Sequence, residues 1–114
     1  MDRVKPIVIR DNEKGVEYTL QFDFASAKFT NNQGFKISEM SDNIEVMLPI
    51  LFYGAFRMHH KDVARNKTDA LLQEISPVSQ DFVIRLLELY SEPRSVLVSD
   101  EPVERKNSNL TVEL

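Results

Sequence analysis

Two adjacent histidines are the residues best suited to chemistry in this chain of 114 residues, which has no other histidine. His59 and His60 end an apolar stretch, and Asp62 follows two positions later. Neighbouring residues of a helix point about 100° apart, so the two imidazoles cannot both face one metal ion from a regular helix. A catalytic zinc ion needs three protein ligands, whereas His59 and Asp62 together supply two. The spacing argues against a metal site and indicates a helix end, where polar or cationic side chains interact favourably with the last carbonyl groups.

Other catalytic patterns find no support in the sequence. The absence of cysteine excludes disulfides, thiolate metal sites and cysteine nucleophiles. No serine lies in a Gly-x-Ser-x-Gly setting, and the three glycines are too dispersed to form a phosphate-binding loop. Carboxylate pairs such as Asp42 and Glu45 are explained by helix capping. We therefore expect a protein that is not an enzyme and that binds no cofactor, metal ion or small-molecule substrate.

The charge balance argues against a nucleic-acid partner. Fourteen Lys and Arg residues stand against 18 Asp and Glu residues, which gives a net charge of -4, whereas nucleic-acid binding depends on neutralising phosphates. The longest nearly apolar run, residues 46–56, is much shorter than the roughly 20 residues that span a bilayer. The N-terminal residues lack the apolar segment of a signal peptide. The sequence predicts a soluble, cytoplasmic protein without membrane or nucleic-acid partners.

The first part of the chain predicts a β-hairpin over residues 6–22. Val16, Tyr18, Leu20 and Phe22 alternate with polar residues, which is the pattern of a half-buried strand, and Gly15 ends the turn before them. An isolated hairpin is only marginally stable in water, so its apolar face must pack against other elements.

Four helices are expected after the hairpin, over residues 24–33, 43–60, 67–75 and 80–91. Asp23 is a suitable N-cap for the first helix, Gly34 is suited to end it, and Ala25 and Phe29 should face the core with Phe24 beside them. The second helix is apolar on most of its faces, which predicts that it is buried on most of them.

Caps and prolines set the expected helix ends. Asp42 and Glu45 have the spacing of a capping box for the second helix, and Pro49 predicts either a kink over residues 46–49 or a start at Pro49 itself. Asn66 or Thr68 could cap the third helix. The fourth begins after Ser79 and should end before Pro93.

These elements predict an α+β fold, in which an N-terminal β-hairpin packs against three to four α-helices. One globular domain is expected over residues 1–98, followed by a charged, flexible C-terminal tail over residues 99–114. The last five residues alternate between apolar and polar, a pattern suited to strand addition to a neighbouring protein, although a frayed terminus is the simpler alternative.

The order of these parts resembles the tail assembly chaperones of long-tailed bacteriophages. The resemblance lies in the segments YTLQFDFASAKFTNNQGFKI, LPILFYGAFRMHHKD and KTDALLQEI. The opening KPIVIRDNEKGVEYTLQFD and the ending RKNSNLTVEL resemble small tail proteins of phages and prophages of Gram-positive hosts. The chain departs from the family pattern at Pro49, at Met58, where an arginine is usual, and at Thr68-Asp69. The positions that match the family are Tyr18, Leu20, Ala27, Gly34, Leu51, Tyr53, Ala55, Phe56, His59, His60, Asp69, Leu71, Leu72 and Ile75.

The resemblance implies a chaperone that binds the long, helical tape measure protein and keeps it soluble while the tail tube assembles. It implies action in the cytoplasm of the host bacterium and absence from the mature virion. The tail tube protein and a second copy of the chain remain open as further partners. The alternative is a structural tail or head–tail connector subunit that stays in the virion.

Eight apolar residues are candidates for contact with such a partner. Six of them could equally be core residues, and both alternatives stay open at the level of the sequence. The candidates are Leu51, Phe52, Phe56, Met58, Leu89, Tyr90, Leu110 and Val112.

Overall fold

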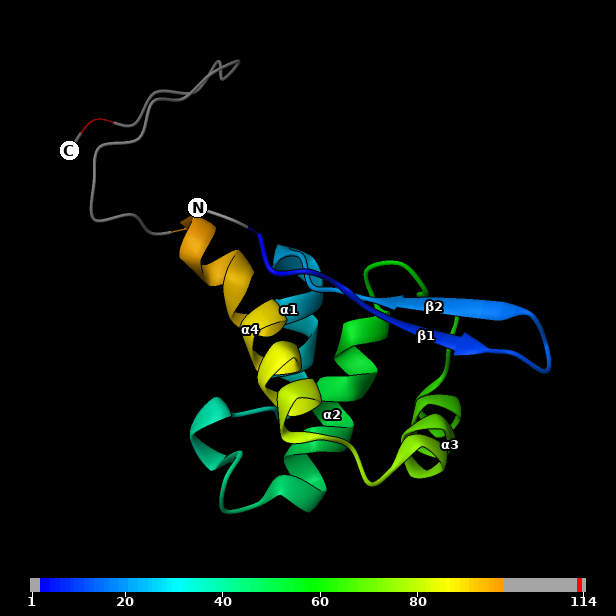
Figure 1. Cartoon of the computed structure of the whole chain (residues 1–114). Helices are drawn as coiled ribbons and strands as arrows, with labels where there is room; N and C mark the ends of the chain where they lie inside the picture. The colour runs from blue at the N-terminus through cyan, green and yellow to red at the C-terminus, as the bar shows by residue number, and fades with distance from the viewer. Residues whose placement is uncertain (1–2, 98–112, 114) are drawn as a thin grey trace.

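A computed structural model of the chain describes residues 3–97 and 113 and confirms the predicted α+β fold (Figure 1). A two-stranded antiparallel hairpin comes first and four α-helices follow it. The elements are β1 (Ile7–Asp11), β2 (Val16–Leu20), α1 (Phe24–Asn32), the short 3-10 helix η1 (Ile37–Glu39), α2 (Ile44–Phe56), α3 (Arg65–Ile75) and α4 (Gln80–Leu97).

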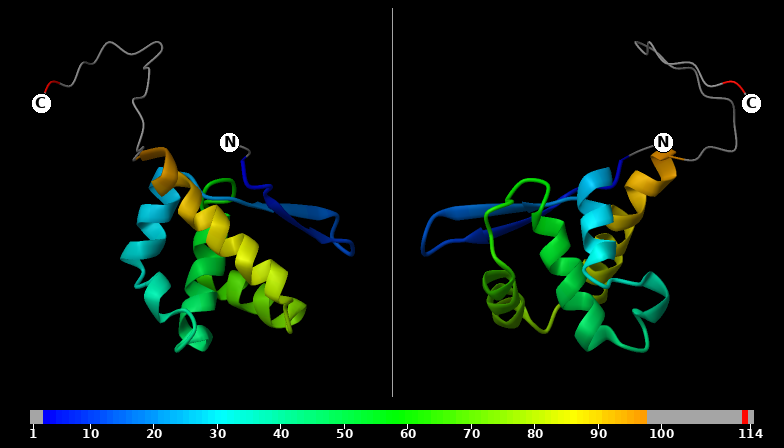
Figure 2. Two further views of the ribbon diagram at one scale, coloured as in Figure 1. Left: turned by 60° about the vertical axis from the view of Figure 1, so that its left-hand side comes forward. Right: turned by 180° about the vertical axis from the view of Figure 1, so that it is seen from behind.

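The hairpin projects from the helices with its turn outward, as the views in Figure 2 show. Its register pairs Ile9 with Tyr18, and the Gly15 N–H donates to the Asp11 carbonyl at 2.8 Å to close the turn. Gly15 has a φ of 66°, which a residue without a Cβ adopts at little cost. Ile7 and Ile9 are half-buried, whereas Val8 between them is exposed, so β1 turns one face to the helices.

The predicted ends of α1 are confirmed. Asp23 and Ser26 form a capping box: the Ser26 N–H donates to Asp23 Oδ1 at 2.8 Å, and the Asp23 N–H donates to Ser26 Oγ at 2.8 Å. At the other end, Gly34 has a φ of 102° and its N–H donates to the Asn31 carbonyl at 3.0 Å. Local sequence is sufficient to define this helix.

Replacing Asp23 by alanine should lower the free energy of unfolding by about 1 kcal/mol, because the N–H and the hydroxyl of Ser26 both lose Asp23 Oδ1 as their acceptor. Partial burial raises the pKa of the Asp23 carboxyl, but hydrogen bonds from Ser26 and from its own N–H, together with the charge of Lys61, outweigh it and leave this pKa below its usual value. The carboxylate therefore stabilises the fold above the pKa of an unfolded aspartate, and this contribution is lost as the pH falls through the lower folded pKa. Urea unfolding of the parent and of Asp23→Asn between about pH 6 and pH 2.5 should show their difference shrinking with acid. A difference that grows with acid would contradict this assignment.

The inward face of α1 differs from the prediction. Ser26 and Thr30 are its buried residues, Ala25 is exposed, and Phe24 retains 56% of its exposure. Phe29 is half-buried against the ring of Tyr53, with their ring centroids 5.6 Å apart.

Gly54 of α2 explains why α1 buries Ser26 and Thr30, each one position beyond the expected Ala25 and Phe29. A Cβ at this position would lie 1.7 Å from Thr30 Oγ1, so the missing side chain lets α1 approach α2 through its small polar residues. Thr30 satisfies its own hydroxyl by donating to the Ser26 carbonyl at 2.8 Å, which allows it to be buried without an unpaired polar atom.

Helix α2 begins earlier than Pro49 and ends before the histidines. Asn43 is its N-cap and makes no side-chain capping bond, so the predicted box of Asp42 and Glu45 does not form. The helix continues through Pro49, where the lack of an N–H leaves one intrahelical bond unmade. It ends at Phe56 rather than at residue 60, and the next residues form turns.

The last two helices also differ from prediction at their ends. Helix α3 starts at Arg65 after Ala64, so neither predicted cap is used, and Thr68 is fully buried within the helix. The Ser79 hydroxyl accepts a hydrogen bond from the Phe82 N–H at 3.1 Å, which confirms the predicted cap of α4. Helix α4 then continues through Pro93 to Leu97, so the expected end before Pro93 is wrong.

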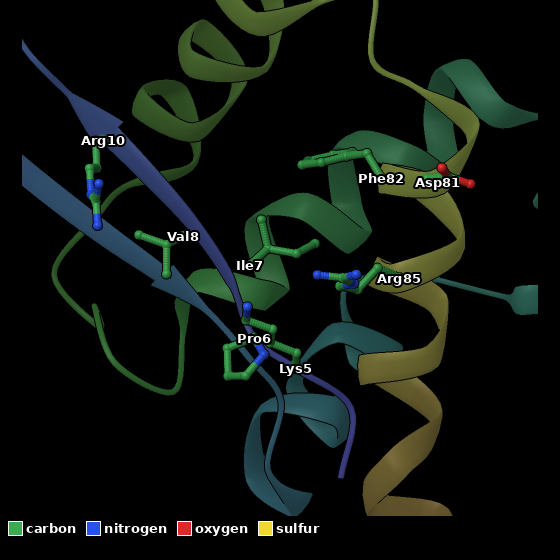
Figure 3. A pocket seen from close by; sticks show the side chains of 8 residues that line it. All are labelled: Lys5, Pro6, Ile7, Val8, Arg10, Asp81, Phe82 and Arg85. Atoms are coloured by element: carbon green, nitrogen blue, oxygen red, sulfur yellow. The ribbon is translucent and has the colours of Figure 1, made fainter. Parts of the chain in front are cut away.

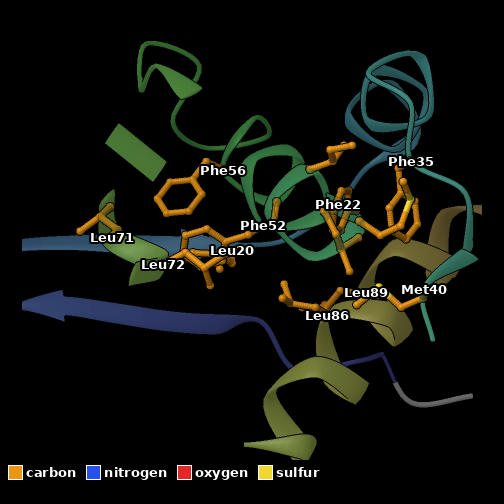
Figure 4. Packing of buried hydrophobic residues seen from close by; sticks show 14 residues of the cluster. Leu20, Phe22, Phe35, Met40, Phe52, Phe56, Leu71, Leu72, Leu86 and Leu89 are labelled. Carbon is orange, nitrogen blue, oxygen red and sulfur yellow. The ribbon is translucent and has the colours of Figure 1, made fainter. Parts of the chain in front are cut away.

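Helix α2 lies at the centre of the core and packs against α1, α3, α4 and β2. Figure 4 shows rings from α2 meeting leucines from α3 and α4 and aromatic side chains from the segments on either side of α1. No helix in the part of the chain that the structure describes is both long enough and apolar enough to cross a membrane. The buried apolar residues are Leu20, Phe22, Phe35, Met40, Met47, Ile50, Leu51, Phe52, Ala55, Phe56, Leu71, Leu72, Leu86 and Leu89.

Candidate functional site

The structure places four of the predicted contact residues inside the core. Leu51, Phe52 and Leu89 have 0% exposure and Phe56 has 1%, so no partner can reach them in this fold. Their burial favours the alternative that they are core residues.

The other four predicted contact residues have different positions. Met58 is half-buried in the turn after α2, and Tyr90 is half-buried on α4. Leu110 and Val112 lie outside the described residues. Among the six candidates that the structure describes, Tyr90 lines a surface groove, as described below.

The two histidines connect the end of α2 to the hairpin. His60 Nε2 accepts a hydrogen bond from the Thr19 N–H at 2.9 Å, which requires the neutral ring with its proton on Nδ1. His59 Nε2 lies 2.8 Å from Gln21 Oε1, and the Gln21 N–H donates to the Ala55 carbonyl at 3.1 Å. The histidines thus lie beyond the helix and bind the backbone and side chains of the strand region.

This contact gives the histidines a structural role. The ring centroid of His60 lies 5.4 Å from that of Tyr18 and 6.3 Å from that of Phe56, so the ring is packed as well as hydrogen-bonded. Among residues 3–97 and 113, no group of three or more His, Cys, Asp or Glu side chains could hold a metal ion. Sequence reasoning missed the partner of His60 because the contact joins positions 41 residues apart.

An open apolar groove of about 350 Å³ lies between α1 and α4. We call it the α1–α4 groove. Its apolar wall consists of Phe24, Ala27, Ile37, Tyr90 and Pro93, and Lys28 and Arg94 supply positive charge. Phe24 and Ile37 are 56% and 49% exposed, although large apolar side chains are usually covered.

Three features build this groove. The capping box fixes the first turn of α1, where Phe24 is the first helical residue and points outward. The left-handed turn at Gly34 leads the chain to η1, which carries Ile37. Tyr90 is held by edge-to-face contacts with Phe35 and Phe22, at centroid distances of 4.8 and 5.4 Å.

A second groove, of about 570 Å³, lies between β1 and the first half of α4. We call it the β1–α4 groove. Figure 3 shows Phe82 and Arg85 extending from α4 toward β1, and the Ile7 side chain of β1 extending toward them. Lys5 and Arg10 lie on the strand side, and Asp81 is the single acidic residue of the lining.

Sequence reasoning missed both grooves. The period of α1 predicts which residues share a face, but the choice of the inward face depends on Gly54, which lies more than 20 residues away. The available signal was the pair Ser26 and Thr30. They lie four positions apart on one face of α1, and their small side chains allow another helix to pack closely against that face.

Comparison with known proteins places the chain in a family without assigning it a role. No curated protein matches the sequence. No solved structure matches it either. A family model described as "Domain of unknown function (DUF5055)" matches residues 3–114. The chain therefore belongs to the DUF5055 family.

Proposed function

We propose that this protein is a phage tail assembly chaperone that binds the tape measure protein and keeps it soluble during tail assembly. The observation that carries the proposal is the α1–α4 groove, in which Phe24 and Ile37 are exposed beside the half-buried Tyr90. The resemblance in sequence supplies the identity of the partner, and the groove supplies a surface for it.

The shape and chemistry of the groove suit an amphipathic helix. A helix that binds between two others inserts side chains spaced three and four residues apart into an apolar groove. The apolar stripe of a tape measure helix offers such side chains. Lys28 and Arg94 would attract acidic residues that flank the stripe.

Two or three apolar anchors are appropriate for a chaperone that must later leave. Full burial of one large apolar side chain contributes about 1.5–3 kcal/mol, and association itself costs several kcal/mol. The groove should therefore bind each segment weakly and reversibly. A long partner with repeated stripes could recruit many copies, and tube subunits could displace them.

The proposal can be tested by co-expressing the chain with the tape measure protein of the same phage or prophage. The double variant Phe24→Asp/Ile37→Asp should lower the soluble yield of the tape measure protein by about tenfold, because two anchors become charged. Aspartate is tolerated in the first turn of a helix, so the variant should still fold. Circular dichroism and the thermal midpoint check the fold.

Val46→Asp is the matched control. Val46 is 46% exposed, lies in the first turn of α2 and is outside the groove, so this change should leave the yield of tape measure protein unchanged. Equal yields with the parent and the double variant would count against the groove as the binding site. A parental chain that fails to raise the yield at all would overturn the chaperone function.

The projecting hairpin favours the second candidate, a tail or head–tail connector subunit, because rings of small connector proteins use hairpins for contact. Mass spectrometry of purified particles separates the two functions. Stoichiometric amounts in the virion would support the connector, and absence from the virion would support the chaperone.

A further inference from the structure

The outer edge of β1 is free to accept another strand. The hairpin forms a sheet of only two strands, so each strand has one edge without a neighbour. His60 lies at the free edge of β2, where its ring accepts a hydrogen bond from the Thr19 N–H. Within residues 3–97 and 113, no backbone bond from outside the hairpin reaches the N–H groups of Val8 and Arg10.

The register shows which groups of β1 point outward. Val8 pairs with Thr19, and the Thr19 N–H points to His60 rather than to Val8. This pair is therefore a non-hydrogen-bonded pair of the antiparallel ladder, and pairs two residues along share its type. The N–H and C=O groups of Val8 and Arg10 consequently point away from β2, toward the β1–α4 groove that they line.

The side chains beside this edge are mainly cationic and apolar. The groove lining holds three cationic residues, Lys5, Arg10 and Arg85, and a single carboxylate, Asp81, although the chain as a whole has a net charge of -4. In the described part of the chain, Arg10 pairs with Glu17 at 2.9 Å on the surface, and neither Lys5 nor Arg85 forms an ion pair. Figure 3 shows the Arg85 guanidinium directed toward β1, whereas Asp81 points away from it.

We infer that this edge binds an extended segment of a partner protein in which apolar and acidic residues alternate. The segment would add to β1 as a third strand through the outward backbone groups of Val8 and Arg10. Its apolar side chains would contact Ile7 and Phe82, and its carboxylates would meet Lys5 and Arg85. The inference is independent of the proposed function, because it concerns another surface and an extended rather than a helical partner.

A labelled synthetic peptide, TVEVTVE, tests the charge preference by fluorescence anisotropy with the full chain. The matched peptide TVKVTVK has the same apolar residues and opposite charge. The acidic peptide should bind about tenfold more tightly at low salt, and the difference should shrink as salt is added. Arg85→Glu should reduce or reverse the preference. Equal binding of both peptides would overturn the inference.

A second pair of variants tests the backbone contact. Val8→Pro removes an N–H that points away from β2 and should leave the hairpin paired, because edge positions tolerate proline. Val8→Thr retains that N–H and is its control. Val8→Pro should lose binding of TVEVTVE, with an unchanged circular dichroism spectrum, and Val8→Thr should keep it.

Two results would contradict the assignment. Unchanged affinity of Val8→Pro would show that the peptide does not bind as a strand. The second result concerns residues 107–114, which end in the alternating sequence LTVEL. If the peptide binds more tightly after these residues are removed, the chain's own segment competes for the edge of β1. That segment, and not a partner protein, would then be the occupant of the edge.

Discussion

Replacing Gly54 with alanine is expected to lower the free energy of unfolding by about 2–3 kcal/mol, because the new methyl group has no space. It would lie 1.7 Å from Thr30 Oγ1 and 2.8 Å from both Thr30 Cβ and Cγ2. Thr30 is fully buried, so it cannot swing into solvent to make room. In an exposed helix the same change would stabilise the protein by about 1 kcal/mol, so the sign of the effect reports on the contact between α1 and α2.

Urea unfolding measures this effect, and the double variant Gly54→Ala/Thr30→Ala is its control. Removing Thr30 Oγ1 and Cγ2 takes away the worst contacts but leaves the Cβ at 2.8 Å. The double variant should therefore be less destabilised than the sum of the two single changes. A Gly54→Ala protein that is more stable than the parent would refute the close approach of these helices.

Phe52→Ala should be the most damaging core substitution, with a loss of about 3–5 kcal/mol in the free energy of unfolding. Phe52 has 0% exposure, and its ring centroid lies 5.0 Å from that of Phe56 and 6.2 Å from that of Phe82. The change would leave a cavity in the core beside α2, and the helices packed around α2 limit how far the surrounding side chains can move in to fill it. Thermal and urea unfolding give the magnitude.

Phe24→Ala is the matched comparison, because the same side chain is removed from a position that is 56% exposed. Its effect on stability should stay within about 0.5 kcal/mol. Under the proposed function it should weaken partner binding instead. The two variants thus distinguish Phe52 from Phe24. From the sequence, Phe52 was a possible contact residue, but it is buried, and Phe24 was expected beside the core, but it is exposed. Similar losses of stability in both would contradict the burial pattern.

The parts of the fold that were predictable are those with local causes. The hairpin follows from alternating residues around a turn that ends in Gly15, and the ends of α1 follow from Asp23, Ser26 and Gly34. Each of these signals acts within a few residues, so a single sequence contains the whole cause.

The wrong predictions for the ends of α2 and α4 lie beside contacts between distant residues. Helix α2 was expected to reach residue 60, but the Thr19 N–H takes His60 as its acceptor and the chain leaves the helix at Phe56. Helix α4 was expected to end before Pro93. Next to this proline, Glu92 accepts a hydrogen bond from the Val4 N–H at 2.6 Å, which ties the start of the chain to the helix.

The location of the candidate site was not predictable from the sequence. The resemblance implied a binding protein with apolar contacts, which stays a prediction, and of the residues named for these contacts Tyr90 lines the α1–α4 groove. Phe24 was expected beside the core, and nothing local to Ile37 marked it as exposed. Whether a side chain is exposed depends on which other elements pack over it, and the residues next to it in the sequence do not determine this.

Both grooves share α4, so if each binds a partner segment as proposed, one partner could occupy both at once. Residues near Phe82 line one groove and residues near Ser91 line the other, about 13 Å apart along the helix axis at 1.5 Å per residue. A partner whose helix and extended segment are joined by a linker of at least about four residues could occupy both grooves. Each groove could then bind its segment weakly while the two together bind the partner tightly, because the second contact forms at the high effective concentration set by the first. Under the proposed function, loss of either contact would leave only one weak site, so the assembling tail would need to displace only one of them to release the partner.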